Sequence, residues 1–333
     1  MNNVIAFAGP VASGKGASVK NLRFWSGADL AARTSNQTKW IVRPWVAEGA
    51  ITEVDGKAKT AGKTTWLTHM VRAVLDGVPF LGEPTTKSPV VYLTEQSEAT
   101  FRVALERAGL LGRHDLSVLF WHETIGTSWP EIVKAARVEC RRIEAKLLIV
   151  DTLAQFTGID GDGENSAGEA LRAMEPLQRA AHRQGLGVVV SRHERKSGGD
   201  VGDSGRGSSA FAGVMDTICS IRRLDGNGRD TLRVIRSVSR IGEAPGELVI
   251  ELTDQGYVPR GSVFDVAMRE AEAAILSAAP RKKKRAMTRD ELLEAAAVKP
   301  TTGVRAVKNL LKQGQLLSKG GGKKNDPYRY WRQ

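Results

Sequence analysis

Residues 50–66 read Ala-Ile-Thr-Glu-Val-Asp-Gly-Lys-Ala-Lys-Thr-Ala-Gly-Lys-Thr-Thr-Trp, and this is the most informative stretch of the chain. A short apolar strand leads into a loop of small residues, after which Gly62-Lys63-Thr64-Thr65 opens a helix expected to extend to Asp76. This order is typical of a phosphate-binding loop, because backbone N–H groups at the start of a helix point at an anion. In such a loop Lys63 reaches the β- and γ-phosphates and the Thr64 hydroxyl holds Mg²⁺.

The spacing of this loop departs from the usual motif, which has four residues between its first Gly and the Gly-Lys pair. Here five residues separate Gly56 from Gly62, so Lys57 stands where the first Gly is expected. A Gly- and Lys-rich surface turn is the alternative interpretation, and the strand–loop–helix context favours the phosphate-binding loop. The residues expected to contact the nucleotide are Lys59, Thr60, Ala61, Gly62, Lys63, Thr64 and Thr65.

A second loop of the same type lies at residues 9–16, where Gly14-Lys15-Gly16 follows an apolar stretch. Its spacing is the more regular, and it resembles the loop of nucleoside monophosphate kinases. However, Gly16 replaces the Ser or Thr that coordinates Mg²⁺. We therefore interpret residues 1–27 as an N-terminal extension. A small-molecule kinase that uses Lys15 is an alternative, but it leaves the basic tail described below unexplained.

The middle of the chain alternates strand and helix patterns, which indicates an α/β fold with a mainly parallel sheet. Three apolar strands end in a polar residue, namely Glu95, Asp151 and His193. Open α/β sheets bind ligands at this edge. Asp151 fits a Mg²⁺-binding carboxylate, Glu95 fits the base that activates water, and His193 fits a sensor of the γ-phosphate. The structural alternatives are a loop cap, a surface charge and a structural His. The segments 217–224, 231–238 and 247–252 are expected to be late antiparallel strands.

The composition narrows the class of protein. The 333 residues contain only two Cys, without metal-ligand spacing, and 41% hydrophobic residues. A run of about 18 apolar residues, the length needed to span a bilayer, does not occur. We therefore expect a cytoplasmic protein that has no membrane partner.

The positive charge is concentrated in the tail, because residues 281–333 contain 15 Lys and Arg against 4 Asp and Glu. After a helical and basic linker at 263–285, residues 286–333 are predicted to form two helices and a basic hairpin, which resembles a winged helix. A basic disordered tail is the alternative. The residues expected to contact the DNA backbone are Arg305, Lys308 and Lys312 on the second helix and Lys323 and Lys324 on the wing.

Residues 28–262 are expected to form a P-loop ATPase domain. From about residue 28 to residue 258 the chain resembles the RecA-like ATPases of the plasmid RepA type, relatives of ring-shaped replicative DNA helicases. The matching segments are 61–65, 90–95, 147–151, 193–196, 206–209 with Asp216, and 239–240. The resemblance implies a homohexamer with nucleotide between subunits and single-stranded DNA in a central channel. It also implies an arginine finger, for which Arg240 and Arg206 are rival positions. Arg195 and Lys196 would then contact DNA phosphates in the channel.

Together these features predict an ATP-dependent DNA helicase or translocase that acts in DNA replication, with ATP and Mg²⁺ as cofactors. The alternative is a DNA-binding ATPase switch that binds ATP and DNA without unwinding. Any priming partner in replication would have to be another chain.

Overall fold

The computed structural model describes residues 24–159, 166–194, 201, 205, 209–224, 230–242 and 244–333. The chain falls into two compact units, residues 1–38 and residues 39–333. In the described part of the first unit, the short helix α1 (Gly27–Arg33) begins at a capping box formed by Ser26 and Asp29. The guanidinium of Arg33 lies 4.1 Å from the ring centroid of Trp25. Within the described ranges, every helix is too short or too polar to cross a membrane.

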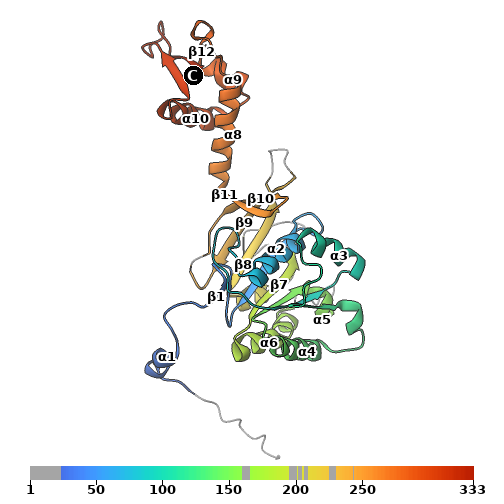
Figure 1. Cartoon of the computed structure of the whole chain (residues 1–333). Helices are drawn as coiled ribbons and strands as arrows, with labels where there is room; N and C mark the ends of the chain where they lie inside the picture. The colour runs from blue at the N-terminus through green and yellow to red at the C-terminus, as the bar shows by residue number, and fades with distance from the viewer. Residues whose placement is uncertain are drawn as a thin grey trace, which may run out of the picture. The chain divides into compact units, whose positions relative to one another are not determined.

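The second unit is built on a sheet that has nine strands within the described residues, in the order β11-β10-β9-β8-β3-β7-β6-β4-β5 (Figure 1). The strands are β3 (Ile51–Gly56), β4 (Val90–Thr94), β5 (Leu116–Phe120), β6 (Leu147–Asp151), β7 (Gly187–His193), β8 (Thr217–Arg223), β9 (Leu232–Ser239), β10 (Leu248–Thr253) and β11 (Gly256–Gly261). Strands β3 to β8 run parallel to one another, whereas β9, β10 and β11 are antiparallel. The expected α/β class with late antiparallel strands is confirmed.

Helices cover both faces of this sheet, as expected for parallel strands. One face carries α2 (Lys63–Asp76) and α3 (Glu98–Arg107). The other face carries α4 (Trp129–Arg142), α5 (Leu153–Thr157), α6 (Ala167–Gln184) and α7 (Ser209–Val214). The side chains of β6 point alternately to the two faces of the sheet. Ile149 packs under α2 and α3, and Leu148 and Val150 pack under the helices of the other face, so the sequence of β6 is continuously apolar. A single-turn helix, η1 (Trp121–Thr124), follows β5.

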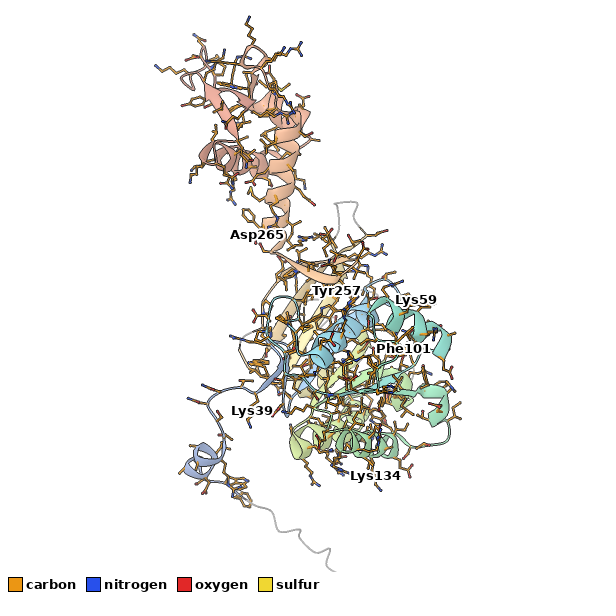
Figure 2. All side chains as sticks on the ribbon, in the orientation of Figure 1. Lys39, Lys59, Phe101, Lys134, Tyr257 and Asp265 are labelled. Carbon is orange, nitrogen blue, oxygen red and sulfur yellow. The ribbon has the colours of Figure 1, made fainter. Side chains whose placement is uncertain are left out.

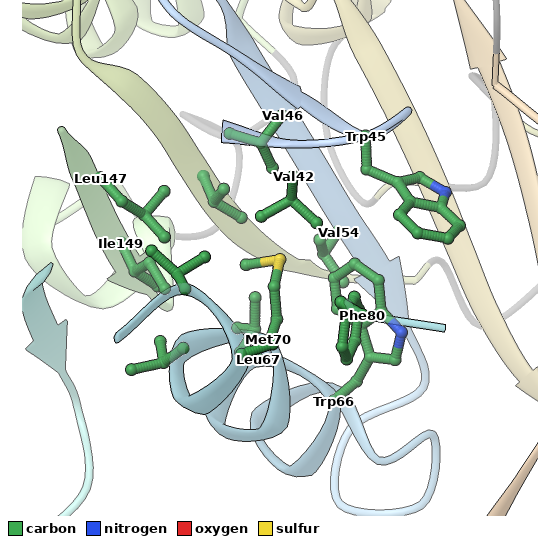
Figure 3. Packing of buried hydrophobic residues seen from close by; sticks show 14 of the residues in the cluster. Val42, Trp45, Val46, Val54, Trp66, Leu67, Met70, Phe80, Leu147 and Ile149 are labelled. Atoms are coloured by element: carbon green, nitrogen blue, oxygen red, sulfur yellow. The ribbon is translucent and has the colours of Figure 1, made fainter. Parts of the chain in front are cut away.

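The helix α2, which follows the loop at residues 57–62, rests on an apolar base (Figure 3). Leu67 and Met70 of α2 are fully buried. Trp66 lies edge-to-face against Trp45 and Phe80, with ring centroids 6.1 and 5.3 Å away. Trp45 comes from the turn between the short strands β1 (Trp40–Val42) and β2 (Val46–Ala47). Each such buried side chain contributes about 1.5–3 kcal/mol, so the start of α2 is held firmly.

The C-terminal residues form a small module with its own core (Figure 1). Its elements are α8 (Val263–Ala278), η3 (Lys283–Arg285), β12 (Met287–Thr288), α9 (Arg289–Ala295), α10 (Pro300–Lys312), β13 (Leu316–Lys319) and β14 (Arg329–Arg332). The strands pair in the order β12-β14-β13. The core includes Ile275 of α8, Leu292 of α9, Leu310 of α10 and Tyr330 of β14. Helix α8, which the sequence suggested as a linker, therefore contributes directly to this core.

Several elements differ from the sequence-based expectation. Strand β8, expected to be antiparallel, pairs in parallel with β3 and antiparallel only with β9. Strand β11 was not predicted, because it begins and ends with Gly and contains Pro259. Pro is tolerated in this position because β11 is an edge strand of the sheet. Strands β1 and β2 and helix α5 were missed because they are too short to show a period.

Candidate functional site

The polar residues that follow the parallel strands meet at one edge of the sheet. In the registers of the strands, Thr94 lies beside Asp151, and Gly56 lies beside His193. The carboxyl ends of β3, β4, β6 and β7 are therefore aligned. This alignment brings Lys63, Glu95, Asp151 and His193 together, as the sequence predicts.

The loop between β3 and α2 is shaped by two glycines. A Cβ on Gly56 would lie 2.6 Å from the Ile221 carbonyl oxygen and 2.7 Å from the Ala61 Cβ, so only Gly fits at the end of β3, beside β8. Gly62 caps α2 with a φ of 85°, a conformation that favours Gly. Gly56 thus has a packing role. The first N–H groups of α2 have no carbonyl partner within the helix, which suits them to bind an anion.

The Lys63 ammonium lies at the centre of this edge. Its Nζ donates a hydrogen bond of 2.9 Å to the Gly56 carbonyl and lies 3.3 Å from Nδ1 of His193. Burial lowers the pKa of Lys63, while the carboxylates of Asp151 and Glu95 act in the opposite direction. The hydrogen bond to the Gly56 carbonyl therefore positions the Lys63 ammonium near the N-terminus of α2, where an anion would bind.

A hydroxyl and a carboxylate meet beside Lys63. The Thr64 hydroxyl donates to Oδ2 of Asp151 at 2.8 Å, and the Tyr92 hydroxyl donates to the same oxygen at 2.9 Å. Gln96 donates to the Thr64 hydroxyl at 3.2 Å. Burial raises the pKa of Tyr92 well above its usual value, and Asp151 adds to this shift, so Tyr92 stays a donor. One hydroxyl and one carboxylate fit Mg²⁺, which usually keeps several waters and binds phosphates for its other ligands.

Glu95 is held in place by the neighbouring strand. Its backbone N–H donates to the Asp151 carbonyl at 2.8 Å. Its side chain accepts a short hydrogen bond from the Thr152 hydroxyl. The carboxylate is only half-buried. It is therefore oriented by protein contacts and still reachable by water.

A family model described as an AAA domain matches residues 18–199, which is more than half of the chain. The chain belongs to the AAA domain family. It therefore has an ATP-binding ATPase domain, and the match includes the loop at Lys63, Glu95, Asp151 and His193. No curated protein matches the chain.

Two side chains that sequence reasoning missed cover the phosphate-binding loop of the AAA domain. Nε of Arg233, on β9, donates to the Ala61 carbonyl at 2.9 Å. The Tyr257 hydroxyl, on β11, would lie 3.3 Å from a Cβ on Gly62. Tyr257 lies at the same end of the sheet as Lys59 (Figure 2). Because both side chains come from the late strands, which lack a motif, no sequence signal would have identified them.

A cavity of about 480 Å³ lies on the β8 side of the loop. Its lining includes Lys57, Thr60, Arg222, Arg223 and Arg236. Arg223 Nε donates to the Thr60 carbonyl at 3.4 Å. The cavity therefore lies next to the phosphate-binding loop, and its lining is strongly basic.

A buried ion pair stiffens the strand that ends in His193. Arg192 donates to both carboxylate oxygens of Glu53, at 3.1 and 3.0 Å. Burial raises the pKa of Glu53, while Arg192 acts in the opposite direction. Because the two side chains are almost completely buried, removing Arg192 would leave the Glu53 carboxylate buried without its ion-pair partner, which typically costs about 3–5 kcal/mol.

Arg240 is not brought to the nucleotide edge. It follows β9, whose last residue, Ser239, pairs with Thr217 at the start of β8. Thr217 in turn lies beside Thr52, near the start of β3. Arg240 is therefore at the opposite end of the sheet from Lys63, separated by the length of the six-residue strand β3, which is about 17 Å. Its side chain is exposed and donates to the Gly213 carbonyl.

The residues expected to contact DNA fall into two groups. Arg305, Lys308 and Lys312 are exposed on one side of α10, and Lys323 and Lys324 are exposed between β13 and β14. The Arg305 guanidinium lies 5.6 Å above the Phe264 ring of α8. The other candidates, Arg195, Lys196 and Arg206, lie outside the described residues, as does Lys15.

Proposed function

We propose that this chain is an ATP-dependent DNA helicase or translocase that acts in DNA replication as a ring of identical subunits. The observation that supports the proposal is that the candidate finger Arg240 lies at the opposite end of the sheet from the other candidate site residues. Lys63, Glu95, Asp151 and His193 meet at the carboxyl edge, whereas Arg240 lies at the other end. We infer that an arginine in that position serves the nucleotide of a neighbouring subunit. The resemblance to RepA-type ring ATPases supports the same arrangement.

The roles of the residues follow from their positions. Lys63 exchanges the Gly56 carbonyl for the β- and γ-phosphates, and the N–H groups of α2 bind the same phosphates. Thr64 and Asp151 hold Mg²⁺, which neutralises charge on the phosphates when it is bound. Glu95, oriented by Thr152, positions and deprotonates the attacking water. His193 contacts the γ-phosphate and so couples the presence of this phosphate to the position of strand β7. The ion pair between Arg192 and Glu53 holds this strand in place.

The experiment that tests this proposal is strand separation on a forked DNA duplex. The wild-type protein should separate the strands with ATP and Mg²⁺, and it should not do so with a non-hydrolysable ATP analogue. The Lys63→Ala variant is the negative control. ATP-dependent binding of the fork without strand separation would contradict the helicase assignment and support a DNA-bound ATPase switch.

We assign the contacts with duplex DNA to the C-terminal module, as a winged helix whose second helix is α10. The support is charge, since Arg305, Lys308 and Lys312 share one exposed side of α10 and Lys323 and Lys324 lie on the hairpin. Phosphate contacts release counterions, so affinity depends steeply on salt. They carry no information about base sequence.

Alanine at both Lys323 and Lys324 should lower the log–log slope of duplex affinity against salt by about 2, because each contact contributes about 0.9. Fluorescence anisotropy across a salt series measures this slope. Alanine at Lys87 and Lys134, two exposed lysines of the first 262 residues, is the matched control. An unchanged slope for the wing variant would show that the hairpin does not contact DNA.

A further inference from the structure

The three-stranded sheet of the C-terminal module has two different faces. Leu316 and Tyr330 are buried in the module's core. The pairs that alternate with them point the other way, because Leu317 lies opposite Trp331 and Lys319 lies opposite Arg329. Leu317 and Lys319 are exposed and Trp331 is partly exposed. The outer face of the sheet therefore presents apolar and basic side chains to solvent.

The basic run Arg281–Arg285 lies against this outer face. The N–H of Arg332 donates to the Pro280 carbonyl at 3.0 Å, which joins the start of the run to β14. The ammonium of Lys283 then lies 5.5 Å from the ring centroid of Trp331. We call Lys283, Leu317, Lys319 and Trp331 the sheet patch. All five residues of the basic run are exposed, and neither β13 nor β14 contains Asp or Glu.

From this arrangement we infer that the sheet patch binds single-stranded DNA, with one base stacked on Trp331 and the adjoining phosphates held by Lys283 and Lys319. Arg329, which lies opposite Lys319, pairs with Glu291 of α9 at 3.9 Å. A flat aromatic ring among cations is suited to a polyanion with exposed bases. The Lys283 ammonium is near the 6 Å limit of a cation–π contact. A base can therefore displace the Lys283 ammonium from the Trp331 ring, and the ammonium then contacts a phosphate of the same strand.

The sheet patch is separate from helix α10, which carries three of the five residues assigned to duplex DNA. Arg332 lies opposite Leu316 in the strand pair, so its side chain is on the inner face. Its guanidinium donates to the Leu276 carbonyl of α8. Helix α10 also packs on α8, where Asn309 donates to Glu272 at 3.1 Å. Both helices thus lie on the inner side of the sheet, opposite the patch. A duplex hides the faces of its bases, so stacking on Trp331 selects single strands.

The experiment uses the full-length protein without nucleotide, and it measures the anisotropy of labelled oligo-dT and of a short duplex. Trp331→Ala should weaken binding of oligo-dT between about 5-fold and about 150-fold, the range for loss of one stacked base. It should leave duplex affinity unchanged. Trp331→Phe should restore most of the affinity for oligo-dT. Equal loss for both DNAs, or no loss for either, would overturn the inference.

A matched control comes from α10, where alanine at Lys308 and Lys312 should weaken duplex binding and leave oligo-dT binding unchanged. A second measurement does not depend on the folding of any variant. Photo-crosslinking of wild-type protein to oligo-dT that carries iodouracil should label the peptide containing Trp331. Crosslinks found only elsewhere would contradict the inference.

The choice of DNA over RNA rests on the proposed function, and tighter binding of oligo-rU than of oligo-dT would overturn that choice. A failure of strand separation leaves the Trp331 crosslink intact, so the two proposals fail independently.

Discussion

Replacing Lys63 by Ala should abolish ATP hydrolysis, whereas Lys15→Ala should leave the rate nearly unchanged. Lys63 is buried beside the N-terminus of α2, 3.3 Å from His193 and next to the Thr64–Asp151 pair. The other two lysines of the loop, Lys57 and Lys59, are exposed. Lys15, by contrast, is followed by Gly16, which has no hydroxyl for Mg²⁺, and the AAA domain match begins only at residue 18.

The measurement is phosphate release at saturating ATP and Mg²⁺ for the wild type and both variants. Thermal unfolding of the Lys63→Ala protein should show a cooperative transition, because the aromatic base formed by Trp45, Trp66 and Phe80 is untouched. A protein that is inactive with Lys15→Ala and active with Lys63→Ala would place the nucleotide at the N-terminal loop and contradict the proposed site.

The second large effect is expected at Glu95 and Arg240, the two groups that we propose act on the γ-phosphate from different subunits. Glu95→Gln should bind ATP and assemble normally, since the amide oxygen still accepts the hydrogen bond from Thr152. It cannot take a proton from water, so hydrolysis should become far slower. Arg240→Ala should lower the rate by about 10³–10⁵, the range for loss of an arginine finger.

Arg142→Ala is the matched control for Arg240. Arg142 is an exposed arginine at the end of α4, shortly before the start of β6, and thus near the same end of the sheet as Arg240. Its replacement should leave the hydrolysis rate unchanged. An equal loss of rate in the two variants would mean that any charge at this end of the sheet matters, rather than a specific finger.

The meeting of Lys63, Glu95 and Asp151 at one edge of the sheet could be predicted from sequence because two strong local signals coincide there. Val90–Thr94 and Leu147–Asp151 are buried on both faces, so each is a continuous apolar run that stops at a polar residue. Parallel pairing then places Glu95 and Asp151 at one edge. The αL turn at Gly62 and the helix after it are equally local features.

The rest of the site could not be predicted, because it depends on contacts between segments that are distant in sequence. Arg233 reaches the carbonyl of Ala61 across 172 positions of the chain. Arg192 and Glu53 form their buried pair across 139 positions. In each case the sequence alone predicts that a single charged residue in a strand faces solvent. Its partner can be identified only when the order of the strands in the sheet is known.

The C-terminal module shows the same contrast. Its capped helices were evident, since Thr288 and Glu291 form the expected capping box. The role of α8 was not evident, because a helix that contributes Met268 and Ile275 to the core has the same pattern as an amphipathic linker. The two-residue strand β12 is too short to carry any pattern, yet it pairs with β14 and completes the sheet.

The central claim is that ATP is hydrolysed between two subunits, and mixing Arg240→Ala with Glu95→Gln protein tests it most directly. Each variant alone should be nearly inactive. In mixed rings some boundaries combine an intact Glu95 site with an intact Arg240 from the neighbour, so the hydrolysis rate should recover and should pass through a maximum as the mixing ratio changes. No recovery at any ratio, in assemblies shown to exchange subunits, would contradict the claim.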